Sequence, residues 1–313
     1  MSPRIIFAGT PDFARVHLKA LLDAGIKPVA VYTQPDRPSG RGHKLTPSPV
    51  KQLALENSIE VLTPENFKAE EDIAAFERLN ADICIVVAYG LILPQRVIEA
   101  PRYGCINVHG SILPRYRGAA PIQRALLNGD SQTGVAIMKI VKALDAGDVY
   151  TTAYLNIEKD DTSGTLFEKL ADLGAKTLLK ALPEILNGSL QAVKQDEALV
   201  TYAAKIEKSE AMLDFNKSAS ELDLLVRGLN PWPVAYFSIN GEKYKVFKAT
   251  PLEKNSSEPA GTITDCNKLG IEVACGEGTL RLETIQAPNK GKVQAADYAR
   301  SNSKKIANGM KVD

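Results

Sequence analysis

Short uninterrupted apolar runs recur through the first half of the chain, and no other feature limits its fold as strongly. Three of them cover residues 4–9, 29–33 and 81–88. Continuous runs of β-branched residues suit strands that are covered on both faces, as in a parallel sheet. Stretches of helical periodicity, such as residues 65–79, separate the runs. This alternation predicts the α/β fold class, with a Rossmann-like, mostly parallel sheet domain.

The second half of the chain has a different pattern. A helix is expected over residues 219–227, with Gly228 as the residue just past its end. The pair Asn240-Gly241 lies between two alternating runs, which is typical of a hairpin. Further short strands are expected over 263–266, 271–275 and 279–285. Such a series predicts a small all-β, OB-like barrel domain, a fold that often binds oligonucleotides.

The change of pattern divides the chain. We expect a first domain over residues 1–189, a linker over 190–206 and a second domain over 207–313. The first domain should also contain strands over 105–109 and 134–141 and a helix over 165–186.

Charge and cysteine usage exclude several classes of protein. The 38 Lys and Arg residues nearly balance 37 Asp and Glu, so the whole-chain charge indicates neither a nucleic-acid nor a membrane partner. The four cysteines form no CxxC pair, so we expect no disulfide framework and no metal. The longest uncharged apolar stretch, residues 83–93, is well short of the ~20 residues that cross a bilayer. We expect a cytoplasmic monomer that makes no membrane contact.

Two polar residues stand out on the strand expected over 105–109. Because side chains alternate along a strand, Asn107 and His109 project from the same face, and Gly110 follows at once. The carboxyl ends of strands in an open α/β sheet border the ligand crevice, where a site is expected. The alternative, that both side chains are satisfied structurally at a strand end, is equally compatible with this spacing.

A carboxylate follows the next expected strand. If the strand over 134–141 neighbours the one that ends at His109, Asp145 lies at the same sheet edge and can orient the imidazole. A simple turn role for Asp145 is the alternative. No GxSxG motif surrounds Ser111, so a serine hydrolase is poorly supported. Direct acyl transfer fits better, because an amide and a protonated imidazole can stabilise an oxyanion, each donor contributing ~3 to 4 kcal/mol.

Four motifs carry a family resemblance. They are RIIFAGTPDFA at 4–14, TQPDRPSGRGHKLTPSPVK at 33–51, INVHGSILPRYRGAAPIQRA at 106–125 and LDAGD at 144–148. In this order they resemble the methionyl-tRNA formyltransferases of the folate-dependent formyltransferase family, over the whole chain. The Asn-x-His and Leu-Asp-x-Gly patterns are shared with the wider group, which includes glycinamide ribonucleotide formyltransferase. The 33–51 segment and the second domain distinguish the two.

The resemblance implies a reaction and a set of residues. It implies transfer of a formyl group from 10-formyltetrahydrofolate to the α-amine of methionine on initiator methionyl-tRNA. The implied catalytic trio is Asn107, His109 and Asp145, acting on a directly attacking amine. The implied folate contacts are Val87, Tyr89, Gly90, Leu91, Ser111, Ile112, Leu113 and Pro114. The second domain then becomes a tRNA-binding domain.

Two basic segments suggest where RNA contacts the protein. Residues 34–51 contain four prolines and two glycines, which predicts a long loop. Expected tRNA contacts are Arg37, Arg41, Lys44 and Arg117. Arg41 matches the arginine that the family uses at the tRNA acceptor end. A solvated basic loop is the alternative.

Two other classes of function are weighed against this one. The opening strand, turn and helix are similar to a dinucleotide fold, which would suit a nicotinamide-dependent oxidoreductase. However, the turn is Gly9-Thr10-Pro11-Asp12 and lacks the GxGxxG that lets a pyrophosphate approach the backbone. A non-catalytic RNA-binding protein that keeps a degenerate transferase domain is the third hypothesis.

Overall fold

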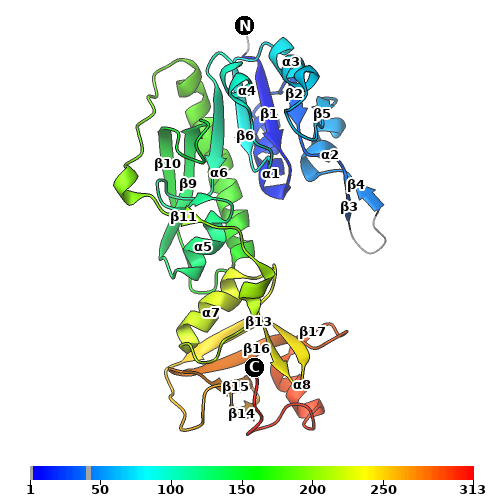
Figure 1. The fold of residues 1–313 in the computed structure, drawn as a ribbon, viewed down its shortest axis with the longest axis vertical. Coiled ribbons are helices and arrows are strands. Elements are labelled where there is room, and N and C mark those ends of the chain that lie inside the picture. The colour runs from blue at the N-terminus through cyan, green and yellow to red at the C-terminus, as the bar shows by residue number, and fades with distance from the viewer. Residues whose placement is uncertain (1–2, 40–43) are drawn as a thin grey trace. The chain divides into compact units, whose positions relative to one another are not determined.

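The computed structural model describes residues 3–39 and 44–313 and divides into two compact units (Figure 1). Unit 1 comprises Met1–Pro121, Gln132–Asn156 and Phe167–Ala203, and unit 2 comprises Ile122–Ser131, Ile157–Leu166 and Ala204–Asp313. Two short segments that precede residue 189 therefore belong to unit 2. The boundaries expected at 189 and 207 stay predictions.

Unit 1 is built on a seven-stranded sheet in the order β10-β9-β7-β6-β1-β2-β5. Its strands are β1 (Ile5–Gly9), β2 (Ala30–Tyr32), β5 (Glu60–Leu62), β6 (Ile83–Val87), β7 (Cys105–His109), β9 (Gln132–Lys139) and β10 (Val149–Asn156). The five strands β7, β6, β1, β2 and β5 are parallel. Strand β9 runs antiparallel to β7, and β10 runs antiparallel to β9. This confirms the expected Rossmann-like, mostly parallel sheet.

Helices cover both faces of this sheet. They are α1 (Asp12–Asp23), α2 (Pro49–Glu56), α3 (Glu70–Arg78), α4 (Gln95–Glu99) and α6 (Ser163–Leu186), the last beginning in unit 2. Val108 of β7 faces α6, because a methyl group at Gly174 would lie 3.0 Å from it. Cys105 of the same strand packs on the other face, with Phe76 of α3 and Val97 of α4. By alternation, Asn107 and His109 point to the face that α3 and α4 cover.

The segment expected as a long loop contains regular structure instead. Strand β3 (Arg37–Ser39) pairs antiparallel with β4 (Lys44–Thr46), and α2 begins soon afterwards at Pro49. The prediction of a continuous loop over 34–51 was therefore wrong. Proline is tolerated at the first position of a helix, where its missing N–H has no partner to lose. Ser48 caps α2 by accepting a hydrogen bond from the N–H of Lys51.

A buried histidine makes the stability of unit 1 sensitive to pH. His17 of α1 is fully buried, its Nδ1 donates to the Phe13 carbonyl at 2.7 Å, and its Nε2 has no partner among the described residues. Burial lowers the pKa of His17 from 6.5 to about 4. Between these pH values the unfolded chain binds a proton that the folded chain does not. The free energy of unfolding therefore falls as the pH falls from 6.5 to 4, by about 3 kcal/mol from this group.

Comparison with a His17→Leu variant isolates this contribution from carboxylates that titrate in the same range. Denaturant unfolding of both proteins is measured at pH 7 and at pH 4.5. Between these pH values the free energy of unfolding of the parent should fall by more than that of the variant. A difference that does not change with pH would contradict the neutral, buried state of His17.

Unit 2 contains an antiparallel sheet that curls. Its strands are β12 (Tyr236–Ile239), β13 (Glu242–Leu252), β14 (Ile263–Asn267), β15 (Gly270–Ala274), β16 (Thr279–Gln286) and β17 (Lys292–Gln294). They follow the order β12-β13-β16-β15-β14, and β17 pairs with β16. Asn240 and Gly241 have φ angles of 50° and 79° and join β12 to β13, which confirms the expected hairpin. The expected β-barrel domain is thus present as a half-barrel, with helices packed on its sheet.

The last residues of the chain connect the two edges of this sheet. The N–H of Ile263 in β14 donates to Met310, and the N–H of Ser238 in β12 donates to Asp313. The N–H of Asp313 donates back to Ser238 at 2.9 Å. Backbone groups that two edge strands would leave unpaired are satisfied in this way.

Helices α7 (Ala219–Gly228) and α8 (Ala295–Ser301) pack on the sheet of unit 2. Gly228 belongs to the last turn of α7, so the expectation that it lies past the helix end was wrong. A methyl group there would lie 2.6 Å from Leu127 of α5 (Pro121–Leu127). Close packing is therefore the reason for a glycine at this position. Within residues 3–39 and 44–313, no helix combines the length and apolar character needed to span a bilayer.

Candidate active site

Asn107 and His109 lie in the middle of the sheet of unit 1. Strand β7 is flanked by β6 and β9, with Val86 and Met138 beside Asn107. The Asn107 side chain is half-buried and makes no hydrogen bond to any residue that the structure describes. Partly buried amides without a hydrogen-bond partner are uncommon in folded proteins, so this one is a candidate for binding a ligand. His109 is only 6% exposed.

The imidazole of His109 is held by a neighbouring loop. Its Nε2 donates to the carbonyl oxygen of Tyr116 at 2.9 Å, because a carbonyl can only accept. Tyr116 has a φ of 65°, in the left-handed region that residues with a side chain rarely adopt. This hydrogen bond assigns a proton to Nε2 and leaves Nδ1 facing another partner.

Nδ1 of His109 faces the Asp145 carboxylate, with 3.8 Å to Oδ2. The two residues do meet, but not by the route that the sequence suggested. Strand β9 runs antiparallel to β7, with Lys139 beside Ile106 and Ala136 beside His109. The loop after β9 therefore starts near the amino end of β7 and folds back. Asp145 thus lies beside the imidazole as expected, and the antiparallel direction of β9, which the sequence did not indicate, is what makes the loop fold back to reach it.

The returning loop is fixed at its carboxylate. Oδ2 of Asp145 accepts a hydrogen bond of 2.8 Å from the N–H of Gly118, and Asp145 has a φ of 47°. Residues 116–118 thus contact both members of the pair, through the carbonyl of Tyr116 and the N–H of Gly118. A carboxylate held beside an imidazole stabilises its cationic form.

A tight turn after β6 borders the same face. The carbonyl oxygen of Tyr89 accepts hydrogen bonds from the Thr10 hydroxyl at 2.9 Å and from Gln34 Nε2 at 3.2 Å. The Tyr89 side chain is buried, and burial raises the pKa of its hydroxyl. The N–H and C=O groups of Gly90 and Leu91 make no hydrogen bond within the described part of the chain. Such a turn offers donors and acceptors to a ligand edge.

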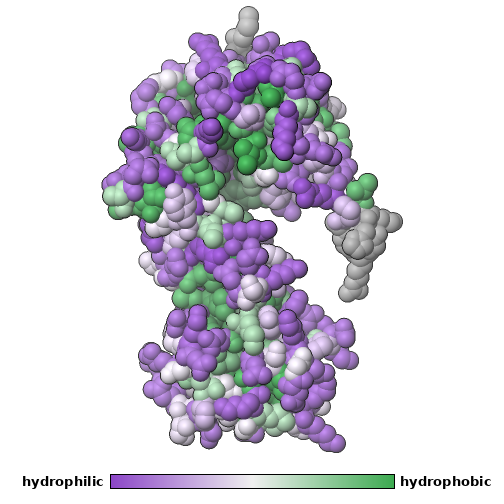
Figure 2. Space-filling model, viewed as in Figure 1, coloured by the Kyte–Doolittle hydropathy of each residue, from purple (hydrophilic) through white to green (hydrophobic). Residues whose placement is uncertain are grey.

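Side-chain alternation changes one expected contact. Val87 is fully buried on the face opposite Asn107, whereas Val86 lies next to Asn107. Beyond the turn, Ile92 is 93% exposed. Figure 2 shows apolar side chains gathered at the surface over β6 and α4.

The second expected contact segment, residues 111–114, forms a turn that closes on itself. The Ser111 hydroxyl donates to the Arg115 carbonyl at 2.7 Å, and Leu113 is buried against Ala136 and Met138. Ile112 and Pro114 are half-exposed. Ser111 and Leu113 hold the turn, and the other two side chains remain accessible.

The expected RNA contacts are placed less uniformly. Arg37 is exposed on β3, Arg41 lies outside the described residues, and the side chain of Lys44 is not among those described. Arg117 is 3% exposed, and its guanidinium is hydrogen-bonded to Glu197 at 2.8 Å, which raises the pKa of Arg117. Because Arg117 is buried, its guanidinium is not accessible to a phosphate, and the structure does not support the expected RNA contact at this residue.

Several residues that shape the site have no motif that sequence reasoning could use. Thr10 and Gln34 hold the turn after β6, and Thr201 accepts a hydrogen bond of 2.9 Å from the Tyr116 N–H. Gln195 donates to the Asp145 carbonyl. These partners are 55 to 85 residues apart in three of the four contacts, so only folding brings them together.

Gly118 is the most constrained position around the pair. Its φ is 124°, and a methyl group there would lie 2.8 Å from the carbonyl oxygen of Ala203. We expect Gly118→Ala to lower the free energy of unfolding by about 1 to 3 kcal/mol. Denaturant unfolding measures this, with Gly188→Ala as control, because that glycine also has a positive φ (76°) but has no atom within 4 Å of an added methyl group. If both variants lost the same free energy of unfolding, the close contact with Ala203 would not be the cause of the destabilisation.

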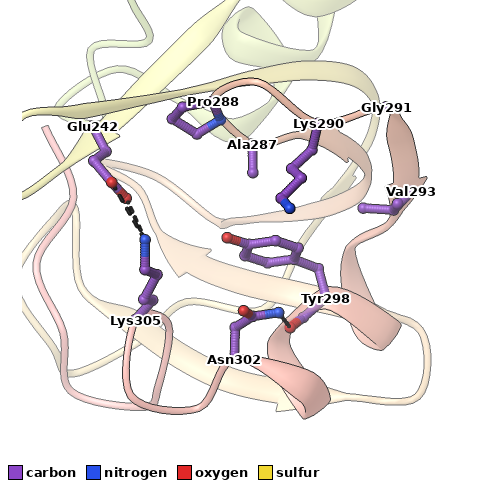
Figure 3. Close-up of a pocket in the computed structure, with 9 residues that line it drawn as sticks. All are labelled: Glu242, Ala287, Pro288, Lys290, Gly291, Val293, Tyr298, Asn302 and Lys305. Atoms are coloured by element: carbon purple, nitrogen blue, oxygen red, sulfur yellow. Dashed lines mark hydrogen bonds and ion pairs between the residues drawn. The ribbon is translucent and has the colours of Figure 1, made fainter.

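Unit 2 has a separate hollow of about 430 Å³ between the start of β13, the turn after β16 and α8. Figure 3 shows Lys290 and Tyr298 pointing into this hollow, and Lys305 paired with Glu242. Other cations of unit 2 are also engaged: Lys243 lies 4.2 Å from the Tyr236 ring centroid and Lys292 lies 3.8 Å from that of Phe247. No group of three or more His, Cys, Asp or Glu side chains that could hold a metal occurs among residues 3–39 and 44–313.

Solved structures share this fold. HypX from Aquifex aeolicus in complex with tetrahydrofolic acid is 16% identical, with a TM-score of 0.63 over 98% of this chain. The chain spans about half (49%) of the length of HypX. An N-formyltransferase from Helicobacter canadensis in complex with folinic acid and dTDP-3-aminofucose is 20% identical, covering 90% of this chain and 99% of its own, with a TM-score of 0.66. WlaRD, a sugar 3N-formyl transferase, is 18% identical, covering 93% and 100%, also with a TM-score of 0.66.

Two family models match the sequence itself. The model described as formyl transferase matches residues 3–182, and the one described as formyl transferase, C-terminal domain, matches residues 205–303. The first match contains Asn107, His109 and Asp145 and spans more than half of the chain. The chain therefore belongs to the formyl transferase family.

Proposed function

We propose that this protein transfers the formyl group of 10-formyltetrahydrofolate to the α-amine of methionine on initiator methionyl-tRNA. The observation that carries formyl transfer is the convergence of an unpartnered amide, a buried imidazole and a carboxylate 3.8 Å from that imidazole. The choice of tRNA as acceptor rests on the resemblance of the four sequence motifs. In this role the protein acts in the cytoplasm, as a monomer, at the initiation of translation.

The side chains divide the chemistry between them. When bound, 10-formyltetrahydrofolate supplies the formyl carbon. As the amine forms its bond to this carbon, the bond from the carbon to N10 breaks, and N10 takes up the proton that the amine loses. The Asn107 amide donates to the oxygen that becomes negative as the amine attacks, a contribution of ~3 to 4 kcal/mol for one such donor. His109, protonated at Nδ1, donates in the same direction, and Asp145 stabilises the imidazolium. The Tyr116 carbonyl keeps the ring oriented throughout through Nε2.

The residues after β6 fit a flat heterocycle. The unpaired backbone groups of Gly90 and Leu91 offer a donor and acceptor edge, with the apolar side chain of Leu91 beside them. Ile112 and Pro114 are the accessible members of the second segment. We assign the folate contact to these four residues, with Tyr89, Ser111 and Leu113 supporting the turns and Val87 supporting the sheet.

The hairpin of β3 and β4 is the proposed contact for the acceptor end of the tRNA. Arg37 is exposed on this hairpin, and Arg41 and Lys44 belong to the same basic segment. Phosphate contacts of this kind depend on salt. In unit 2, Lys290 offers a further charge beside the hollow of Figure 3.

A sugar amine is the second candidate acceptor. It is favoured by the match to the Helicobacter canadensis N-formyltransferase, which covers 99% of that chain and whose structure contains dTDP-3-aminofucose. Asn107, His109 and Asp145 could catalyse transfer to either amine. The choice of acceptor therefore depends on which molecule the residues around the trio can bind.

Transfer of radiolabelled formyl from 10-formyltetrahydrofolate tests the proposal. Charged initiator tRNA, charged elongator methionyl-tRNA and a dTDP-amino sugar are offered in parallel reactions. We expect label on initiator methionyl-tRNA in preference to the elongator. Label on the sugar alone would replace the acceptor and leave formyl transfer intact, whereas no label on any amine would overturn the proposal.

A further inference from the structure

We propose that Gln195 is a positioning residue for the reaction, acting through Asp145. It belongs to the segment between residues 193 and 203, here called the strap, which lies within the linker expected over residues 190–206. This inference rests on the proposed catalytic role of Asp145. Gln195 is 6% exposed, although it is followed by four exposed residues.

The amide of Gln195 is fully used. Its Nε2 donates to the carbonyl oxygens of Asp145 at 2.8 Å and Gly147 at 2.7 Å. Its Oε1 accepts from Nε of Arg117 at 3.0 Å. A buried glutamine with both donors on one loop and its acceptor on another clamps the two loops against each other.

These hydrogen bonds form a ring that links Gln195, Asp145 and residues 117–118 beside the candidate catalytic pair. Gln195 donates to the carbonyl of Asp145, and the carboxylate of Asp145 accepts from the N–H of Gly118. Arg117, the residue before Gly118, donates to Gln195. Asp145 needs such support, because its φ of 47° is unfavourable for a residue with a side chain. Loss of the two Gln195 donors removes the only hydrogen bonds that the carbonyls of residues 145 and 147 accept from the residues that the structure describes.

The strap is itself fixed at both ends, so it can act as a rigid support. Val193 exchanges two backbone hydrogen bonds of 2.9 Å with Val149 at the start of β10. At the other end, β11 (Tyr202–Ala203) pairs with β8 (Arg117–Gly118). Thr201 also accepts from the N–H of Tyr116, the residue that orients His109. All of these contacts lie within unit 1.

Two substitutions remove the Gln195 donors in different ways. Gln195→Glu keeps the size and the acceptor for Arg117 but places carboxylate oxygens against the two carbonyls, and Gln195→Leu removes all three hydrogen bonds. For both we expect kcat of formyl transfer to fall about 30-fold, with KM for the folate donor within about twofold, because displacement of a catalytic group by about 1 Å costs up to 100-fold. Gln191→Leu makes the same chemical change at an exposed glutamine four residues earlier and should keep the parental kcat.

A double-mutant cycle with Asp145→Ala separates positioning from general damage. If Gln195 acts through Asp145, Gln195→Glu in the Asp145→Ala background lowers kcat by less than about threefold. Multiplying effects would overturn the inference, and so would a parental kcat in Gln195→Glu while Asp145→Ala is slow. A parental rate in Asp145→Ala would instead overturn the catalytic trio of the proposed function, and the inference with it. Denaturant unfolding of each variant confirms that a folded protein is assayed.

Discussion

Asn107→Ala is expected to slow formyl transfer at least ~100-fold, the effect of losing one oxyanion donor. The same change should alter the free energy of unfolding little, because the Asn107 amide makes no hydrogen bond within the described residues. The effect of Asn107 on the rate is therefore separable from its effect on stability. Single-turnover rates with saturating donor and acceptor, measured beside denaturant unfolding, give both quantities.

Two further variants sharpen the interpretation. Asn107→Asp keeps the shape and loses the donor, so it should be as slow as Asn107→Ala. Asn156→Ala removes an exposed strand asparagine at the end of β10 and should keep the parental rate. A parental single-turnover rate in Asn107→Asp would falsify the oxyanion role.

His109→Ala is expected to lower both rate and stability. Transfer should slow at least ~100-fold, because the protonated imidazole is the second donor. The free energy of unfolding should fall by about 1 to 3 kcal/mol, because the carbonyl of Tyr116 loses its partner in a buried position. The two residues of the Asn-x-His motif thus differ in how much the fold depends on them.

His109→Gln separates these two losses. A glutamine amide can donate to the Tyr116 carbonyl but cannot become a cation, so stability should return towards the parent while the rate stays low. His17→Leu alters the histidine on the opposite face and should leave the rate unchanged. Recovery of both rate and stability in His109→Gln would show that the ring serves only to hold the loop.

Local sequence chemistry was sufficient for several of the elements. The apolar runs predicted β1, β2 and β6 of the parallel sheet, and the pair Asn240-Gly241 predicted the β12–β13 turn, since two consecutive positive φ angles favour these residues. Alternation along β7 placed Asn107 and His109 on one face. Each of these conclusions depends on near neighbours in the chain.

Where the prediction was wrong, a distant contact or a strand direction decided the outcome. Prolines over 34–51 suggested a loop, yet the cross-strand pairs of β3 and β4 formed in spite of Pro38. The periodicity of β9 carried no information about its antiparallel direction, which sends Asp145 back towards His109 from the far end. Gly228 was attributed to backbone conformation, but the side chain of Leu127 requires it.

The sequence by itself determined the alternation of strands and helices in the first domain, the shared face of Asn107 and His109, and the family motifs, because these follow from side-chain periodicity and short-range chemistry. Only the tertiary structure decided that Asp145 reaches His109, and that Gln195 and the Tyr116 carbonyl hold the pair. Hydrogen bonds between residues 50 apart, such as that from Gln195 to Asp145, leave no periodic trace in a sequence. They exist because the folded backbone brings their donors and acceptors within 3 Å of each other.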